Sequence, residues 1–173
     1  MAEKRQMAVF VGHGDPMMAL RDDEVAHGLR AMGEKVLADK PRAILAVSAH
    51  WFTRGTLVQS DPTPRQVNDM HGFPPELYAI TYRPKGNAEL TRRVRELLGA
   101  DVEVDDTWGI DHGAWTPLHH MLPHADYAVP TPDHYLPLLT VLGAAEGERA
   151  EVFNKVRNLG SISMTSYAFG LGK

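Results

Sequence analysis

Residues 8–13 read Ala-Val-Phe-Val-Gly-His, and residues 43–50 read Ala-Ile-Leu-Ala-Val-Ser-Ala-His. Each is a short apolar run, rich in strand-forming residues, that stops at a histidine. A run that is apolar on both faces is typical of a buried strand in a parallel sheet. Because ligands bind at the carboxyl ends of such strands, we expect His13 and His50 to meet there. Two convergent imidazoles predict a metal site, although each histidine could instead cap its strand by bonding a backbone carbonyl.

The residues around these two runs predict how they are joined. Apolar residues recur at helical spacing over residues 23–39, and Pro41 ends that helix. A strand, a helix and a second strand form a right-handed crossover, which makes the strands parallel. Similar patterns predict later elements: helices over 88–98, 115–122 and 131–143, and strands over 56–60, 79–83, 102–104 and 161–165. We therefore expect an α/β fold, a single domain whose central, mostly parallel or mixed sheet is flanked by helices.

The composition limits what this chain can bind. Its 173 residues suit one domain, and a net charge of −4 offers no basic surface for nucleic acid. No apolar stretch is long enough for a membrane span, and the N-terminus lacks a signal-peptide pattern. The absence of cysteine excludes thiolate ligands and favours a cytoplasmic setting, so a bound metal must use His, Asp or Glu.

Nine histidines are spread along the chain, and three more of them are candidates for a site. His112 lies among glycines and is either an exposed loop residue or a hydrogen-bond donor beside the metal. His134 falls near the start of the predicted 131–143 helix, whose positive end would keep it neutral and able to bind a cation. His71 sits in the long proline-rich loop of residues 61–75 and could shape a substrate pocket. We expect the other four to be solvent-exposed: His27, His119, His120 and His124.

Several segments together resemble a known family. In chain order they are Gly-His-Gly-Asp-Pro at 12–16, Ser-Ala-His-Trp at 48–51, Gly-Phe-Pro at 72–74, Trp-Gly-Ile-Asp-His-Gly at 108–113 and Thr-Pro-Asp-His-Tyr-Leu-Pro at 131–137. The series resembles the class III extradiol ring-cleavage dioxygenases of the LigB type, in the branch with the DOPA-type extradiol dioxygenases. The resemblance covers residues 1–173 as one domain, apparently shortened between about residues 126 and 131, where an internal segment of the family is missing.

The resemblance implies a metal centre and a reaction. It implies that His13, His50 and His134 bind one divalent metal, Fe(II) or Zn(II), and that His112 is a catalytic residue beside the substrate. It further implies a substrate pocket formed by Asp15, Trp51, His71, Phe73 and Tyr135. The implied reaction inserts both atoms of O₂ into a catechol-type aromatic ring and opens it next to the hydroxyls. A three-ligand site leaves coordination positions for the catechol and for O₂.

Two other functions agree with the same residues. Three neutral histidines and a water also describe a hydrolytic zinc centre. Alternatively, the chain is a non-catalytic metal-binding remnant that completes its sheet by association. Strand edges exposed by the missing segment would favour such pairing, for example in a homo-oligomer. Turnover of catechols with O₂ uptake distinguishes the first function from these two.

Overall fold

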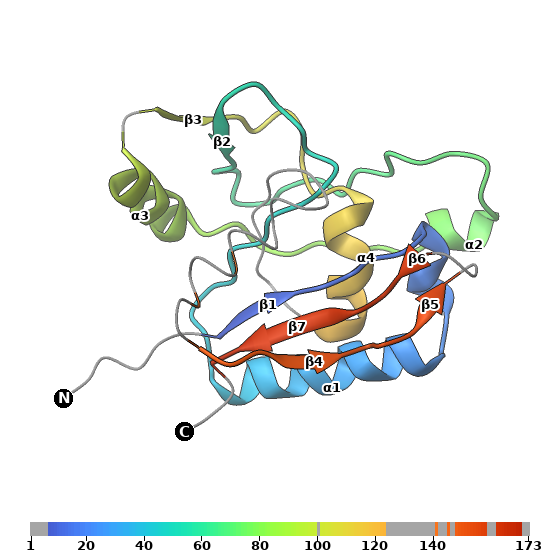
Figure 1. Ribbon diagram of the computed structural model, residues 1–173. Helices are drawn as coiled ribbons and strands as arrows, with labels where there is room; N and C mark the ends of the chain where they lie inside the picture. The colour runs from blue at the N-terminus through green and yellow to red at the C-terminus, as the bar shows by residue number, and fades with distance from the viewer. Residues whose placement is uncertain are drawn as a thin grey trace.

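The structure, a computed structural model, describes residues 7–99, 101–123, 141, 145, 148–158 and 162–170. In chain order the elements are β1 (Ala8–Phe10), the 3₁₀ helix η1 (Pro16–Leu20), α1 (Glu24–Ala38), β2 (Thr56–Val58), α2 (Pro75–Tyr78), α3 (Ala88–Leu98), β3 (Val102–Val104), α4 (His112–Met121), β4 (Glu151–Phe153), β5 (Arg157–Asn158), β6 (Ile162–Ser163) and β7 (Ser166–Phe169). Helices and strands form one mixed domain (Figure 1), which confirms the predicted α/β class.

The two ends of the described chain meet in one sheet. Strand β7 lies between β1 and β4 and is antiparallel to both, with Ala8 opposite Phe169 and Glu151 opposite Ala168. Strands β2 and β3 pair in parallel, and β5 and β6 form a short antiparallel pair. The described strands therefore make parallel and antiparallel pairs in three small sheets, and the N-terminal strand that leads to His13 depends on a C-terminal neighbour.

The predicted helices over 23–39 and 88–98 are confirmed as α1 and α3, and both begin at a capping side chain. The carboxylate of Asp23 accepts hydrogen bonds from the backbone N–H groups of Val25 and Ala26. The side chain of Asn87 accepts one from Leu90. These bonds satisfy N–H groups that have no partner inside the helix. Helix α3 ends at Gly99, whose φ of 94° favours glycine.

Helix α4 begins three residues before the predicted start at 115. Asp111 is its N-cap, and the Asp111 side chain accepts a hydrogen bond from the backbone N–H of Ala114. This cap sets the first turn, so Pro117 lies inside the helix rather than at its start. His112 is therefore the first residue of a helix, and not a residue of an exposed loop.

Residues 43–49 are not a strand, and the predicted crossover to a parallel neighbour of β1 is wrong for the described residues. A strand needs ladder hydrogen bonds to a neighbour, and the described neighbour of β1 is β7. The segment is partly packed against the core, which Ile44 and Ala46 contact, while Leu45 is 49% exposed. The segment nevertheless leads to His50, which belongs to the cluster of three histidines described below.

Other predicted elements also differ from the structure. The predicted strand at 79–83 is absent because the side chain of Gln66 takes the place of a neighbouring strand: its amide donates to the carbonyl of Ile80 and accepts from the N–H of Tyr82. The predicted strand at 161–165 is reduced to β6 at Ile162–Ser163, since Met164 and Thr165 are not in a strand and β7 begins only at Ser166. The predicted helix at 131–143, apart from residue 141, and the shortened junction near 126–131 lie outside the described residues.

The core lies where α1, α4 and η1 pack together against β7. It includes apolar side chains from all four elements: Met18, Leu29, Met32, Trp115, Leu118 and Ala168. Helix α1, with 15 residues, and the other described helices lack the combination of length and apolar character that a membrane span requires.

Gly33 sets how closely α1 approaches α4, because a Cβ there would overlap the backbone carbonyl of Met121. We predict that Gly33→Ala lowers the free energy of unfolding by about 1–3 kcal/mol through this overlap. Helix propensity alone would change it by about 1 kcal/mol in the opposite direction. Urea unfolding measures the sign, and a stabilised variant would show that the helices are not in this contact.

Candidate metal centre

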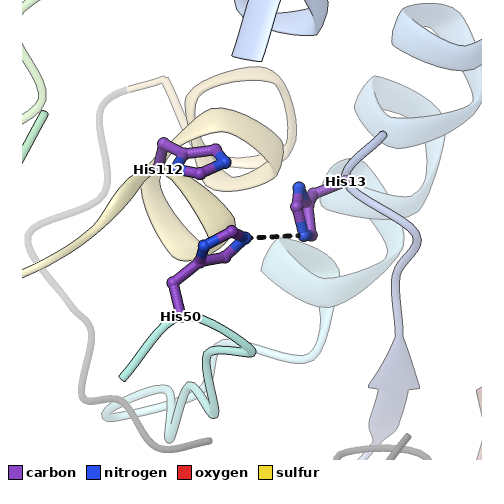
Figure 2. Close-up of side chains that lie close together, drawn as sticks. All are labelled: His13, His50 and His112. Atoms are coloured by element: carbon purple, nitrogen blue, oxygen red, sulfur yellow. Dashed lines mark hydrogen bonds between the residues drawn. The ribbon is translucent and has the colours of Figure 1, made fainter. Parts of the chain in front are cut away.

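Three histidines from distant parts of the chain converge (Figure 2). His13 follows β1, His50 follows the 43–49 segment, and His112 opens α4. Each offers one ring nitrogen, and these three atoms lie within 4.8 Å of one another. His13 and His112 are buried, whereas His50 is half-buried. The structure thus brings together the two strand-end histidines of the sequence analysis and adds His112 to them; His134 lies outside the described residues.

The spacing of the imidazoles suits a divalent cation. The Nε2 atoms of His13 and His50 are 3.3 Å apart. Two nitrogens bound about 2.1 Å from one ion at a tetrahedral angle would be about 3.4 Å apart. The ring of His112 has its centroid 4.0 Å from that of His50 and 5.4 Å from that of His13. The donor set, neutral imidazoles without thiolate, is one that zinc and iron accept.

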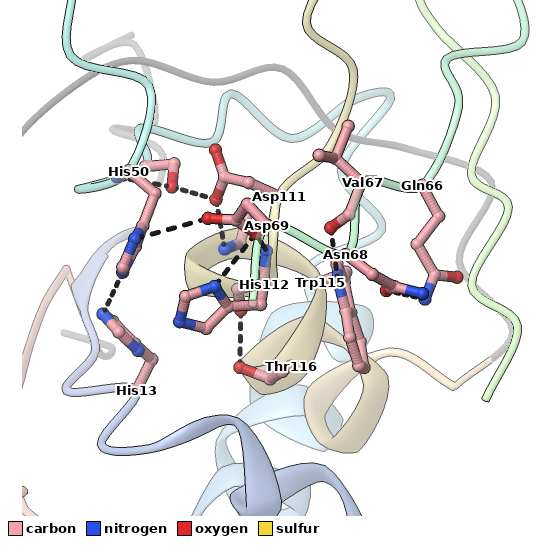
Figure 3. Close-up of polar contacts among 12 residues, drawn as sticks. His13, His50, Gln66, Val67, Asn68, Asp69, Asp111, His112, Trp115 and Thr116 are labelled. Atoms are coloured by element: carbon pink, nitrogen blue, oxygen red, sulfur yellow. Dashed lines mark hydrogen bonds and ion pairs between the residues drawn. The ribbon is translucent and has the colours of Figure 1, made fainter. Parts of the chain in front are cut away.

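Asp69 lies between the rings of His50 and His112 (Figure 3). The sequence did not predict that this residue belongs to the site. Its Oδ1 accepts hydrogen bonds from the backbone N–H of His112 and from His112 Nδ1, each 2.9 Å long. Its Oδ2 lies 3.4 Å from His50 Nδ1. Burial opposes ionisation of Asp69, but these hydrogen bonds from His112 outweigh it and hold the pKa of the carboxyl below its ordinary value. The one signal in the sequence is its place in the unusually long 61–75 loop.

A second buried carboxylate, Asp111, connects His50 to α4. The hydroxyl of Ser48 donates to Asp111, and the backbone N–H of His50 donates to that hydroxyl over 3.2 Å. Trp108 Nε1 also donates to Asp111, over 2.8 Å. Asp111 is 0% exposed, so these donors replace the water that would otherwise solvate its charge. The bonds hold the His50 backbone against the first turn of the helix.

Gly113 makes that close approach sterically possible. A Cβ at this position would lie 2.5 Å from His50 Cδ2 and 2.9 Å from the hydroxyl of Ser48. Any larger residue would therefore displace the imidazole of His50 from the cluster. His13 is placed by a separate contact, because the N–H of Gly12 donates to the hydroxyl of Ser166 in β7.

The predicted pocket residues differ in their surroundings. Asp15 caps η1 by accepting from the N–H of Met17, and its two carboxylate oxygens both accept from Arg21 Nη2, at 3.0 and 2.8 Å. Trp51 is buried beside His50. Phe73 is half-buried against the core, whereas His71 is exposed. Tyr135 lies outside the described residues.

Two histidines that were predicted to be exposed are not. His120 is buried, and its Nε2 donates to the carbonyl of Met18 over 2.8 Å. His119 is half-buried, and burial lowers its pKa, with a smaller contribution from His120. The prediction is wrong because this face of α4 packs on η1 and α1. His27 is exposed as expected, and His124 lies outside the described residues.

Comparisons with known proteins agree with one another. The family described as catalytic LigB subunit of aromatic ring-opening dioxygenase matches residues 7–131. The protein named 4,5-DOPA dioxygenase extradiol from Escherichia coli K12 is 42% identical over 128 residues, which cover 73% of this chain and 46% of that protein. Its namesake from Beta vulgaris is 40% identical over 125 residues, 69% of this chain and 47% of that protein. The chain therefore spans about half the length of these curated relatives.

A solved structure extends the likeness to the C-terminal strands. The crystal structure of the uncharacterized protein JW3007 from Escherichia coli K12 superposes with a TM-score of 0.72 at 26% sequence identity. The match covers 95% of this chain and 99% of that chain.

The Ser48–Asp111 bond generates a stability prediction. We expect Ser48→Ala to lower the free energy of unfolding by about 1–3 kcal/mol, because it removes a donor to a buried carboxylate and the acceptor of the His50 N–H. Ser60→Ala is the matched control, since Ser60 makes a similar bond to Asp106 on the surface and should change stability by about 0.5 kcal/mol or less. Equal losses in urea unfolding would contradict the prediction.

Proposed function

The chain belongs to the LigB family of aromatic ring-opening dioxygenases, and from this premise we propose that it is a metal-dependent extradiol dioxygenase acting on a catechol-type ring. The observation that carries the proposal is the convergence of His13, His50 and His112 within the stretch that matches the family. The proposal concerns this shorter chain, whose match covers 46% and 47% of the two relatives.

We assign the metal to His13 and His50 as described ligands, with His134 as the third ligand that the family resemblance implies. The 3.3 Å separation of the Nε2 atoms of His13 and His50 supports this assignment. The chain has no cysteine, and the all-histidine donor set agrees with Fe(II) or Zn(II). A divalent cation held there would lower the pKa of a catechol hydroxyl and keep the ring and O₂ together.

We assign His112 to the substrate side of the centre. Asp69 accepts from His112 Nδ1, so a neutral His112 ring has its proton on Nδ1 and a lone pair on Nε2. The lone pair can take the proton of a catechol hydroxyl, which is the role of a general base. The first turn of α4 holds this ring beside the other two histidines, so a bound ring would lie within its reach.

The remaining pocket assignments follow the path of the chain around the cluster. The 61–75 loop brings Asp69 to the histidines, and we assign His71 and Phe73 of the same loop to the substrate-facing wall. Trp51 would form the buried side of that wall next to His50. Asp15 would shape the pocket through η1, the 3₁₀ helix that it caps, and not through a bond to the substrate, because its carboxylate is paired with Arg21.

His50→Ala tests the metal assignment. We expect the variant to lose stoichiometric Zn²⁺ binding, with an affinity at least about 100-fold lower, while its far-ultraviolet circular dichroism stays helical. Elemental analysis after dialysis against Zn²⁺ measures the occupancy. His27→Ala, an exposed histidine on α1, should bind as the wild type does. Undiminished occupancy in the His50 variant would remove His50 from the ligand set.

His112→Ala tests the reaction. We expect the Fe(II)-loaded wild type to consume O₂ with DOPA or a related catechol, and the variant to retain the metal but turn over about 10²- to 10⁴-fold more slowly, because it lacks the base. An oxygen electrode and elemental analysis measure the two quantities. A loss of metal as large as in the His50 variant would make His112 a ligand. A wild type that binds metal without O₂ uptake would instead favour hydrolysis or a non-catalytic role.

A further inference from the structure

We propose that Asp69 is the positioning residue of the centre: one carboxylate holds the rings of both His50 and His112, with their Nδ1 atoms protonated and their Nε2 atoms available. The role of Asp69 in binding a metal and in the reaction rests on the proposed function. The positions of the protons on the His50 and His112 rings do not depend on it. The proposal goes beyond the ligand assignment because it names the group that decides which nitrogen each histidine presents.

The two carboxylate oxygens face different rings. Asp69 Oδ1 lies 2.9 Å from His112 Nδ1, and Oδ2 lies 3.4 Å from His50 Nδ1 (Figure 3). The two rings are close together, with centroids 4.0 Å apart. A single aspartate therefore lies beside the same nitrogen of each imidazole, with a hydrogen bond to that of His112 and a longer ion-pair contact to that of His50.

This contact decides where the ring protons reside. A neutral imidazole carries a proton on one nitrogen and a lone pair on the other, and an ionised carboxylate can only accept hydrogen bonds. The carboxylate therefore favours the proton on Nδ1 in both rings. The lone pairs are then on Nε2, and His50 Nε2 faces His13 Nε2 at 3.3 Å. A cation or a substrate proton at the centre of the cluster needs these lone pairs.

Asp69 is itself held in place by the elements around it. Its Oδ1 accepts the first backbone N–H of α4, where the helix dipole favours a negative charge. The adjoining loop is joined to the same region, because Val67 N–H donates to the carbonyl of Ile110 and Trp115 Nε1 donates to that of Val67. The Asp69 side chain is 12% exposed, so little water competes for its oxygens. The carboxylate is thus positioned before any ligand arrives.

The protonation pattern can be measured in the metal-free protein without any variant of Asp69. Long-range ¹H–¹⁵N correlation spectra at pH 8.5, about two units above the ordinary pKa of an imidazole, distinguish protonated from unprotonated ring nitrogens. We expect Nδ1–H forms for His50 and His112, assigned by the signals lost in the two alanine variants. Nε2–H forms at both histidines in the wild type would overturn the proposal, whatever the metal content.

Asp69→Asn supplies the second test. Asparagine offers one accepting oxygen and one donating NH₂ group, so only one end of its amide can accept a hydrogen bond from a ring N–H. We expect at least one ring to change to its Nε2–H form and Zn²⁺ affinity to fall about 10- to 100-fold. Asp69→Glu, which keeps two accepting oxygens, should retain the Nδ1–H forms. Asp106→Asn is the control, because Asp106 accepts from Ser60 and Asp61 on the surface and should change neither quantity.

The outcomes separate this inference from the proposed function. A wild type that shows both Nδ1–H forms but binds no Zn²⁺ would support Asp69 as the positioning residue and contradict the metal centre. Unchanged protonation and unchanged Zn²⁺ affinity in Asp69→Asn would overturn the inference while leaving the metal centre intact. If Asp69→Asn does not fold, the wild-type spectra and Asp69→Glu still decide the question.

Discussion

The close packing of His50 against the first turn of α4 is the contact on which the rest of the site depends. Asp111 caps the helix, Gly113 leaves room for the His50 ring, and His112 contributes its own ring one residue before Gly113. The backbone N–H of His112 also bonds Asp69, so two carboxylates from different loops are anchored at the same helix end. Positive charge density at a helix N-terminus stabilises both carboxylates. These carboxylates in turn hold the ring of His112 and the ring and backbone of His50, so one short piece of backbone organises two of the three histidines, while His13 is placed through Gly12 and Ser166.

Local chemistry made several features predictable from the sequence. Asp23 and Asn87 begin α1 and α3 through bonds to nearby backbone groups, and Gly99 ends α3, so these signals are contained in a few adjacent residues. The meeting of His13 with His50 was also predictable, because apolar runs that end at a histidine lead toward one end of the fold. The expectation succeeded for the histidines although residues 43–49 do not form the predicted strand, since the bonds of Ser48 to Asp111 and to the His50 N–H hold the end of the segment at the first turn of α4.

Features that depend on contacts between distant residues were not predictable in this way. Asp69 reaches His112 across 43 positions, and His120 bonds the carbonyl of Met18 across 102. Nothing in the residues beside Asp69 shows that its carboxylate will face two imidazoles, and helical periodicity alone does not show which face of α4 is covered. The start of α4 was missed for a related reason: Asp111 is a cap only because the chain turns there, and Pro117 within the next turns suggested a later beginning.

The contacts that support the cluster come from two separate parts of the described chain. The contacts of His50 and His112 lie within residues 48–113, whereas the strand that leads to His13 is joined to β7 through Gly12 with Ser166 and through the pairing of β1 with β7. The resemblance places the missing segment near residues 126–131, between these two parts of the chain. A deletion there would remove neither the helix end that holds His50 and His112 nor the strand that supports His13. Such a deletion would leave these described contacts in the chain, and with them the support of the residues that we propose as ligands and as general base.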